Sequence, residues 1–254
     1  MTADLKAAAR TALACLDLTS LNDADTAADI DALCQRAQTA HGNVAAVCVW
    51  PRFVAQARAA LPASIKVAAV ANFPDGALDV QRALADVAEI AQAGGDEVDV
   101  VLPYRALLAG KTSEVGEFLS EVRFASRPLT LKVIIESGEL GSVDRIAQAT
   151  RLALAAGADF VKTSTGKTKV GATPAAAATM LKEIKASGLS AAGFKASGGV
   201  RSVADAAGYI AQAEAALGAE ALNPQRLRFG ASGLLTDIEA VLAGAESAAV
   251  TAAY

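Results

Sequence analysis

Short apolar segments rich in β-branched residues alternate with longer alanine-rich segments of helical periodicity along the whole of this 254-residue chain. Strands are expected over residues 13–18, 44–49, 65–71, 97–102, 131–135, 160–163, 192–195 and 227–230. Helices are expected over residues 23–39, 52–60, 77–93, 115–124, 143–156, 174–185, 203–217 and 234–242. Eight βα units of this length predict an α/β fold, a closed (β/α)8 barrel of the TIM type, with functional side chains at the carboxyl ends of the strands. A doubly wound open sheet is the alternative, and it also binds ligands at the carboxyl ends of its strands.

The segments between these elements indicate one domain. Gly94, Gly157 and Gly188 each follow an expected helix, and a glycine there permits the left-handed conformation that ends a helix. Thr173 followed by Pro174 has the composition of a helix start. No proline-rich, serine-rich or charged linker divides the chain. We therefore expect a single domain over residues 1–254, ending in a flexible tail over residues 246–254.

Charge and composition narrow the possible partners. The chain has 23 basic and 27 acidic residues, a net charge of −4 and no basic block, which argues against binding to nucleic acid. No uninterrupted run of about 18 apolar residues predicts a membrane span. Three widely spaced cysteines fit reduced thiols, so we expect a cytoplasmic protein. The single histidine, His41, is expected at the C-terminal end of a helix, where the helix dipole favours it. One histidine leaves too few nitrogen ligands for a zinc site.

The carboxyl ends of the expected strands carry many polar or small residues. In a barrel they would all face one opening, which we call the mouth. They are Asp17, Thr19, Cys48, Asn72, Asp99, Lys132, Glu136, Lys162, Lys195, Gly230 and Ser232.

Two of these residues, Lys162 and Lys195, each end an apolar run just before a loop rich in Gly, Ser and Thr. Burial disfavours the ammonium form, and a neighbouring cation disfavours it further. Two ammonium groups about 4 Å apart repel by about 4 kcal/mol at an effective dielectric constant of about 20, so one lysine would be neutral near physiological pH. A neutral lysine attacks an aldehyde to form an imine, and Asp99 could move the protons. The residues alone do not say which lysine is the nucleophile.

Two glycine-rich loops have the composition of phosphate cradles. Gly198 and Gly199 precede Arg201 and a helix, and residues 230–233 precede the last helix. In a barrel these loops follow strands seven and eight, where backbone N–H groups bind phosphate, although either loop alone could be a structural turn. Residues 164–168 resemble the end of a nucleotide P-loop, but Val161 stands where that motif needs glycine. We therefore expect Lys167 and Lys169 to be solvated loop lysines, and a place near a bound anion is the alternative for either one.

The chain closely resembles the deoxyribose-phosphate aldolase family, class I aldolases with a (β/α)8 fold. The resemblance runs through residues 16–19, 48–52, 71–74, 96–106, 131–136, 160–167, 193–201 and 228–231. It implies reversible cleavage of 2-deoxy-D-ribose 5-phosphate to D-glyceraldehyde 3-phosphate and acetaldehyde, in deoxyribonucleoside breakdown. It also implies that Lys162 forms the Schiff base, that Lys195 perturbs it, and that Asp99 shares proton transfer with Lys195. No metal or other cofactor is implied, because the iminium is the electrophile.

The resemblance further implies how the substrate is held. Asp17, Thr19 and Cys48 would line the sugar side. The remaining substrate contacts would come from Thr165, Gly166, Lys167, Gly198, Gly199, Val200, Arg201, Gly230, Ser232 and Gly233. Many relatives have a second hydroxyl residue where this chain has Gly233, which leaves one side-chain donor fewer at the phosphate. Tyr254, at the chain end, resembles the family's proton-relay tyrosine.

Other functions fit the residues less well. A Schiff-base aldolase with another donor or acceptor is the nearest alternative, and a phosphosugar-binding barrel without catalysis is a second. Keeping Asp99, Lys162 and Lys195 together argues against the non-catalytic barrel. The partners would be small phosphosugars and aldehydes. Trp50, Phe53 and the apolar helix faces would suit a homodimer, although the sequence does not fix the oligomeric state.

Overall fold

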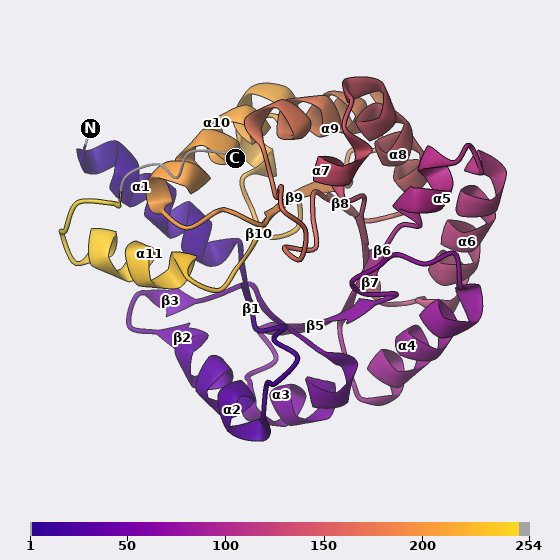
Figure 1. Cartoon of the computed structure of the whole chain (residues 1–254). Helices are drawn as coiled ribbons and strands as arrows, with labels where there is room; N and C mark the ends of the chain where they lie inside the picture. Colours follow the sequence, from indigo (N-terminus) through magenta and orange to yellow (C-terminus); the bar gives the residue numbers. More distant parts are fainter. Residues whose placement is uncertain (1, 249–254) are drawn as a thin grey trace.

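The computed structural model describes residues 2–248 and contains a closed barrel of eight strands, surrounded by helices (Figure 1). The strand order is β1-β10-β9-β8-β7-β6-β5-β4, and every neighbouring pair in the barrel is parallel. A closed sheet with helices between successive strands is a (β/α)8 barrel. The predicted fold class is therefore confirmed, and the open-sheet alternative is wrong.

Each of the eight expected strands is present, with ends that differ by at most three residues. The strands are β1 Leu16–Thr19, β4 Ala46–Val49, β5 Lys66–Ala71, β6 Glu97–Val101, β7 Thr130–Ile134, β8 Phe160–Lys162, β9 Gly193–Ser197 and β10 Leu227–Ala231. The eight expected helices are also present. They are α2 Ala27–Arg36, α3 Val54–Ala60, α4 Val80–Gln92, α6 Thr112–Ala125, α8 Val143–Ala155, α9 Pro174–Ala186, α10 Val203–Leu217 and α11 Leu234–Leu242.

Several further elements were not expected. They are α1 Thr2–Ala14, α5 Tyr104–Leu108, α7 Ser137–Leu140, the 3-10 helices η1 Pro51–Phe53 and η2 Ala219–Ala221, and a hairpin of β2 Gln38–Thr39 and β3 Gly42–Asn43. The first expected strand started too early, because residues 13 and 14 belong to α1, which packs against α10 and α11. His41 lies in the hairpin turn rather than at a helix end, so that interpretation was wrong.

Capping side chains start the helices directly after the loops at the mouth. Thr173 is the N-cap of α9, and its hydroxyl accepts a hydrogen bond from the amide of Ala176 at 3.1 Å. Ser202 and Asp205 form a capping box at the start of α10. These caps fix where each helix begins, and so fix the length of the loop before it.

Apolar packing lies between the strands and the surrounding helices, where Val47, Val98, Val133 and Phe194 are fully buried. The inside of the barrel differs, because ion pairs cross it. Arg228 on β10 reaches Glu97 on β6, which is not a neighbouring strand.

All three cysteines are buried and unpaired. Within residues 2–248, no helix has the length and hydropathy to span a bilayer.

Candidate active site

Asp99 binds two lysines inside the barrel. Lys162 is the last residue of β8, Lys195 lies on β9 and Asp99 lies on β6. The ammonium nitrogen of Lys162 donates to Oδ2 of Asp99 at 2.7 Å, and that of Lys195 donates to the same oxygen at 2.8 Å. None of the three side chains is more than 3% exposed. The three residues predicted to carry the chemistry therefore meet at one point.

Lys132, on β7, occupies the other oxygen of Asp99. Its ammonium nitrogen lies 2.7 Å from Oδ1 of Asp99, 2.5 Å from Oε2 of Glu97 and 3.7 Å from Oδ2 of Asp17. The side chain is fully buried. Asp99 therefore faces cations on both of its oxygens, which fixes the orientation of the carboxylate.

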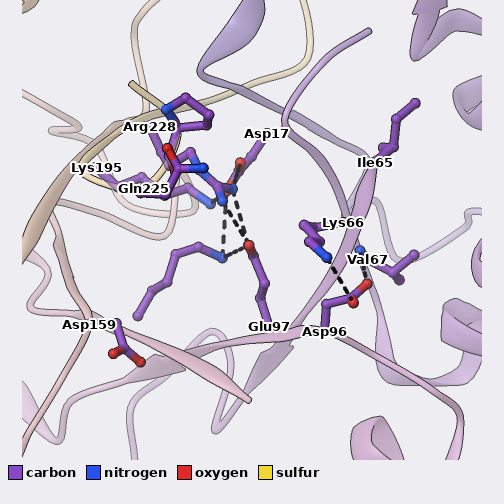
Figure 2. A network of polar contacts seen from close by, with 12 residues as sticks. Asp17, Ile65, Lys66, Val67, Asp96, Glu97, Asp159, Lys195, Gln225 and Arg228 are labelled. Atoms are coloured by element: carbon purple, nitrogen blue, oxygen red, sulfur yellow. Dashed lines mark hydrogen bonds and ion pairs between the residues drawn. The ribbon is translucent and has the colours of Figure 1, made fainter. Parts of the chain in front are cut away.

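Arg228 and Asp17 complete this arrangement. The guanidinium of Arg228 donates to Oδ1 of Asp17 at 2.6 Å and to Oε1 of Glu97 at 2.7 Å, and Asp17 also binds Lys195 (Figure 2). We call the connected residues the buried charge cluster. Its members are Asp17, Glu97, Asp99, Lys132, Lys162, Lys195 and Arg228.

The lysines of the cluster differ in acidity. The pKa of Lys162 lies below its ordinary value of 10.5, because burial outweighs the attraction of Asp99 and the Lys195 charge lowers it further. Burial also opposes the charge on Lys195, but Asp17 and Asp99 outweigh it and raise the pKa of that lysine. The pKa of Lys132 is raised in the same way, chiefly by Asp99 and Glu97 against burial. Among these lysines, Lys162 most readily gives up its proton.

Charge balance leads to the same residue. The cluster holds three carboxylates and four cationic side chains, so one neutral lysine makes it electrically neutral. Three of the cations contact two or more carboxylates, whereas Lys162 contacts only Asp99 among the carboxylates that the structure describes. An uncompensated charge at a buried site is costly. Lys162 is therefore the cation whose neutral form the cluster favours.

Glu136 shapes the loop that follows Lys162. This buried residue has a positive φ of 52°, and its carboxylate accepts from the amide of Thr165 at 3.2 Å and from the Thr165 hydroxyl at 2.5 Å. The Thr168 hydroxyl donates to it at 3.2 Å. Burial raises the pKa of Glu136, against the hydrogen bonds from Thr165. Thr165, predicted to bind substrate, thus uses its own donors on Glu136.

The two glycine-rich loops open their backbones toward the mouth. Gly198 and Gly199 have φ values of 80° and 85°, which other residues rarely adopt. The amides of both glycines donate to no group within residues 2–248. Gly233 is the N-cap of α11 and offers no side-chain hydrogen bond there. Both loops therefore present backbone N–H groups to an anion.

Some of the remaining predicted substrate contacts are exposed on the loops at the mouth. They are Gly166, Lys167, Arg201, Ser232 and Gly233. Lys167 extends to the β1–α2 loop, where its ammonium group donates to the carbonyl of Leu21 at 2.7 Å.

Other residues of the predicted set lie deeper. Asp17 and Cys48 are fully buried, and burial raises the pKa of the Cys48 thiol. The hydroxyl of Thr19 donates to the carbonyl of Asp17 at 2.8 Å, and Val200 is buried. Tyr254 lies outside the described residues.

Gly230 has a steric role that its sequence position did not suggest. A Cβ atom on Gly230 would lie 2.6 Å from Oγ of Ser197 and 3.1 Å from Cε of Lys195. The missing side chain therefore makes room for Lys195.

Glu97 and Arg228 were not expected in the site, and Lys132 had no expected role. A charged residue inside an otherwise apolar strand was the available signal for all three.

The fold and this cluster define a (β/α)8 aldolase, a barrel with a lysine of lowered pKa held against a carboxylate in its interior. A family model described as DeoC/LacD family aldolase matches residues 11–238. The chain is 47% identical over 250 residues to a deoxyribose-phosphate aldolase from Agrobacterium fabrum. The matched residues cover 97% of this chain and 96% of that protein. The chain therefore belongs to the DeoC/LacD aldolase family.

Solved structures agree with this assignment. The apo-form crystal structure of a candidate deoxyribose-phosphate aldolase from Toxoplasma gondii ME49 superposes with a TM-score of 0.86 at 26% identity, over 95% of this chain and 98% of that one. A candidate deoxyribose-phosphate aldolase from Coccidioides immitis gives a TM-score of 0.79 at 29% identity, over 91% of this chain and 87% of that one.

Proposed function

We propose that this enzyme cleaves 2-deoxy-D-ribose 5-phosphate reversibly to D-glyceraldehyde 3-phosphate and acetaldehyde through a Schiff base on Lys162. Family membership and the 47% identical deoxyribose-phosphate aldolase support the substrate and the reaction. The observation that carries the mechanism is the single carboxylate contact of Lys162 in a cluster whose other cations have two or more. We expect the enzyme to act in the cytoplasm, in deoxyribonucleoside breakdown.

The reaction begins at the aldehyde carbon of the open-chain sugar. The neutral amine of Lys162 adds to this carbon, and loss of water leaves a protonated imine. Removal of the proton from the hydroxyl on carbon 3 lets the bond between carbons 2 and 3 break. The bond electrons move into the iminium to give an enamine, and D-glyceraldehyde 3-phosphate leaves. Protonation of carbon 2 and hydrolysis of the imine then release acetaldehyde and restore Lys162.

Asp99 and Lys195 are suited to moving these protons. Asp99 lies within hydrogen-bond distance of Lys162 and Lys195 through one oxygen, so a proton can pass among the three groups. Lys195 stays charged because Asp17 and Asp99 both stabilise its ammonium form. We propose that Tyr254 also takes part in the exchange of protons at carbon 2, as the family resemblance suggests.

The glycine loops would hold the other end of the substrate. We propose that the amides of Gly198 and Gly199, the start of α11 and the hydroxyl of Ser232 bind the 5-phosphate. Helix N-termini and consecutive backbone N–H groups favour a dianion. Anchoring the phosphate at the rim of the barrel would place the sugar aldehyde toward Lys162 in the barrel interior.

A homodimer stays a prediction. Trp50 and Phe53 are only partly buried, and the ring of Trp50 packs edge-on against Phe73 at 5.5 Å between centroids. Sedimentation of the purified enzyme would give its oligomeric state directly.

The test of the mechanism is the mass of the protein after borohydride reduction with acetaldehyde or 2-deoxyribose 5-phosphate. An adduct mapped to Lys162 that disappears in Lys162→Ala supports the proposal. An adduct on Lys195 would reverse the roles of the lysines, and no adduct with either compound would favour a phosphate-binding barrel without catalysis.

A further inference from the structure

A cavity of about 560 Å³ lies outside the barrel, between the β8–α9 loop and the first turns of α10. Its inner edge is formed by Gly166 together with Gly198 and Gly199, the two glycines of the proposed phosphate site. Its outer wall is formed by α10, including Gly208, Tyr209 and Gln212. Its volume lies within the range of small-molecule sites, and the substrate proposed above does not account for its outer part.

The inner end of this cavity suits an anion. Arg201 and Lys169 line it, and neither side chain has a carboxylate partner within residues 2–248. The Asp205 carboxylate also lies in the wall, where it accepts from the amides of Arg201 and Ser202 at 3.0 Å each as the cap of α10. Two cations and the glycine amides therefore outnumber the one carboxylate, which already binds backbone amides.

The outer end suits a flat ring that donates a hydrogen bond. The side-chain oxygen of Gln212 is buried and has no hydrogen-bond partner among the described residues. A buried acceptor without a donor is unusual in a folded protein and favours a ligand that supplies an N–H group. The surrounding wall is largely apolar or aromatic, with Val170, Ala172 and Tyr209.

From this combination, we propose that the cavity binds a nucleoside 5′-monophosphate, with its phosphate at Gly198 and Gly199 and an N–H group of its base on the Gln212 oxygen. The proposal rests on the proposed function in one respect, because the same glycines would hold the substrate phosphate. A bound nucleotide would then compete with 2-deoxyribose 5-phosphate and slow its cleavage.

Gly208 gives a selective way to close the cavity. It lies on α10, and a Cβ atom added there would meet no atom within 4 Å, so a larger side chain fits without displacing the helix. Gly208→Leu should fill the outer part of the cavity and leave the barrel interior unchanged. Ala215→Leu is the matched control, because Ala215 is an exposed residue two turns further along the same helix and does not line the cavity.

The experiment is calorimetric titration of the full-length enzyme and its variants with AMP, GMP, CMP, UMP and inorganic phosphate. At least one nucleotide should bind more tightly than phosphate, and Gly208→Leu and Gln212→Leu should each weaken it at least tenfold while phosphate binding stays the same. The same nucleotide should inhibit aldol cleavage competitively, and the inhibition should persist in Ala215→Leu.

The proposal would be overturned if none of the four nucleotides binds more tightly than phosphate. It would also be overturned if Gly208→Leu binds the nucleotide as tightly as the unmodified enzyme does. If the unmodified enzyme does not bind inorganic phosphate, that result would instead count against the proposed phosphate site. Titration reports on the cavity even if the chain proves inactive as an aldolase, so the two proposals fail separately.

Discussion

Lys162 and Lys195 donate to the same oxygen of Asp99, at 2.7 and 2.8 Å. A carboxylate oxygen shared by two ammonium groups cannot satisfy both as well as a private partner would. Lys195 has Asp17 as a second carboxylate, whereas Lys162 has no second carboxylate within residues 2–248. This asymmetry explains how two buried lysines, side by side on neighbouring strands, acquire opposite pKa shifts.

Replacing Asp99 should separate imine formation from later proton transfers. In Asp99→Asn, Lys162 should keep its position in the barrel but lose the group proposed to move protons to and from the substrate. We expect kcat for cleavage to fall by about 10²- to 10⁴-fold, the range typical of a lost general acid–base group. Reduction with borohydride and acetaldehyde should still label Lys162. Loss of labelling together with activity would show that Asp99 is needed to form the imine itself.

The pH dependence of imine trapping should report the state of Lys162. Its pKa is lowered, so the neutral amine accumulates as pH rises, with a midpoint below 10.5. In Lys195→Met a nearby positive charge is removed, and the midpoint should move to higher pH. The measurement is the initial rate of trapping by cyanoborohydride across pH, with each variant's folding checked by circular dichroism. A midpoint that does not move would mean that burial alone sets the acidity of Lys162.

The same shift has a consequence for stability. The unfolded chain binds a proton at Lys162 up to about pH 10.5, whereas the folded chain releases it at lower pH. The contribution of this lysine to the free energy of unfolding therefore rises with pH between the two pKa values. Lys162→Met should remove that contribution. The free energy of unfolding of the parent should therefore rise relative to that of the variant as pH rises through this window. Urea unfolding at several pH values measures it.

Lys132 should matter chiefly for the stability and orientation of the cluster. Its removal leaves Glu97 and one oxygen of Asp99 without their nearest cation inside the barrel. Breaking a buried ion pair from one side typically costs about 3–5 kcal/mol. Lys132→Met should therefore lower the free energy of unfolding by this order, measured with urea. The double variant Lys132→Met with Glu97→Gln should recover part of the loss, because it removes a carboxylate that has lost its nearest cation. No recovery would argue against the pairing as the cause.

Gly230 should be required for the position of Lys195. A methyl group there would crowd Oγ of Ser197 and Cε of Lys195, so Gly230→Ala should displace the lysine from Asp99. We expect kcat to fall at least tenfold. Gly116→Ala is the control, because Gly116 lies on α6, outside the buried charge cluster. The nearest atom to its added Cβ would belong to Leu152, at 3.9 Å, an ordinary van der Waals contact. Equal activity in both variants would show that Lys195 tolerates the displacement.

The barrel could be predicted from sequence because its signals are local. Period-two and helical patterns, capping residues such as Thr173, and glycines after helices each act over a few residues. The expected start of the first strand was wrong because the apolar pattern runs without a break from the end of α1 into β1. A short apolar stretch cannot by itself distinguish the last turn of a helix from a buried strand.

The ion pairs of the cluster could not be predicted in the same way. Arg228 and Glu97 lie 131 residues apart, and alternation along a strand predicts only that each side chain points inward. Which charges meet depends on the stagger of the strands around the barrel, which the sequence pattern does not contain. The family resemblance implies Lys162 as the nucleophile, and the proposal for that role is supported by the single carboxylate contact of Lys162 among the described residues.

Gly233 offers a test of the phosphate site that adds a group rather than removing one. It is the N-cap of α11, with an ordinary φ of −94° and no atom within 4 Å of an added Cβ, so Gly233→Ser should fit without strain. The new hydroxyl adds a side-chain donor at the proposed phosphate site. KM for 2-deoxyribose 5-phosphate should fall severalfold, with little change in kcat. The unphosphorylated sugar 2-deoxyribose is the matched control, since its KM should not change. An equal fall for both substrates would show that the serine acts on the loop rather than on the phosphate.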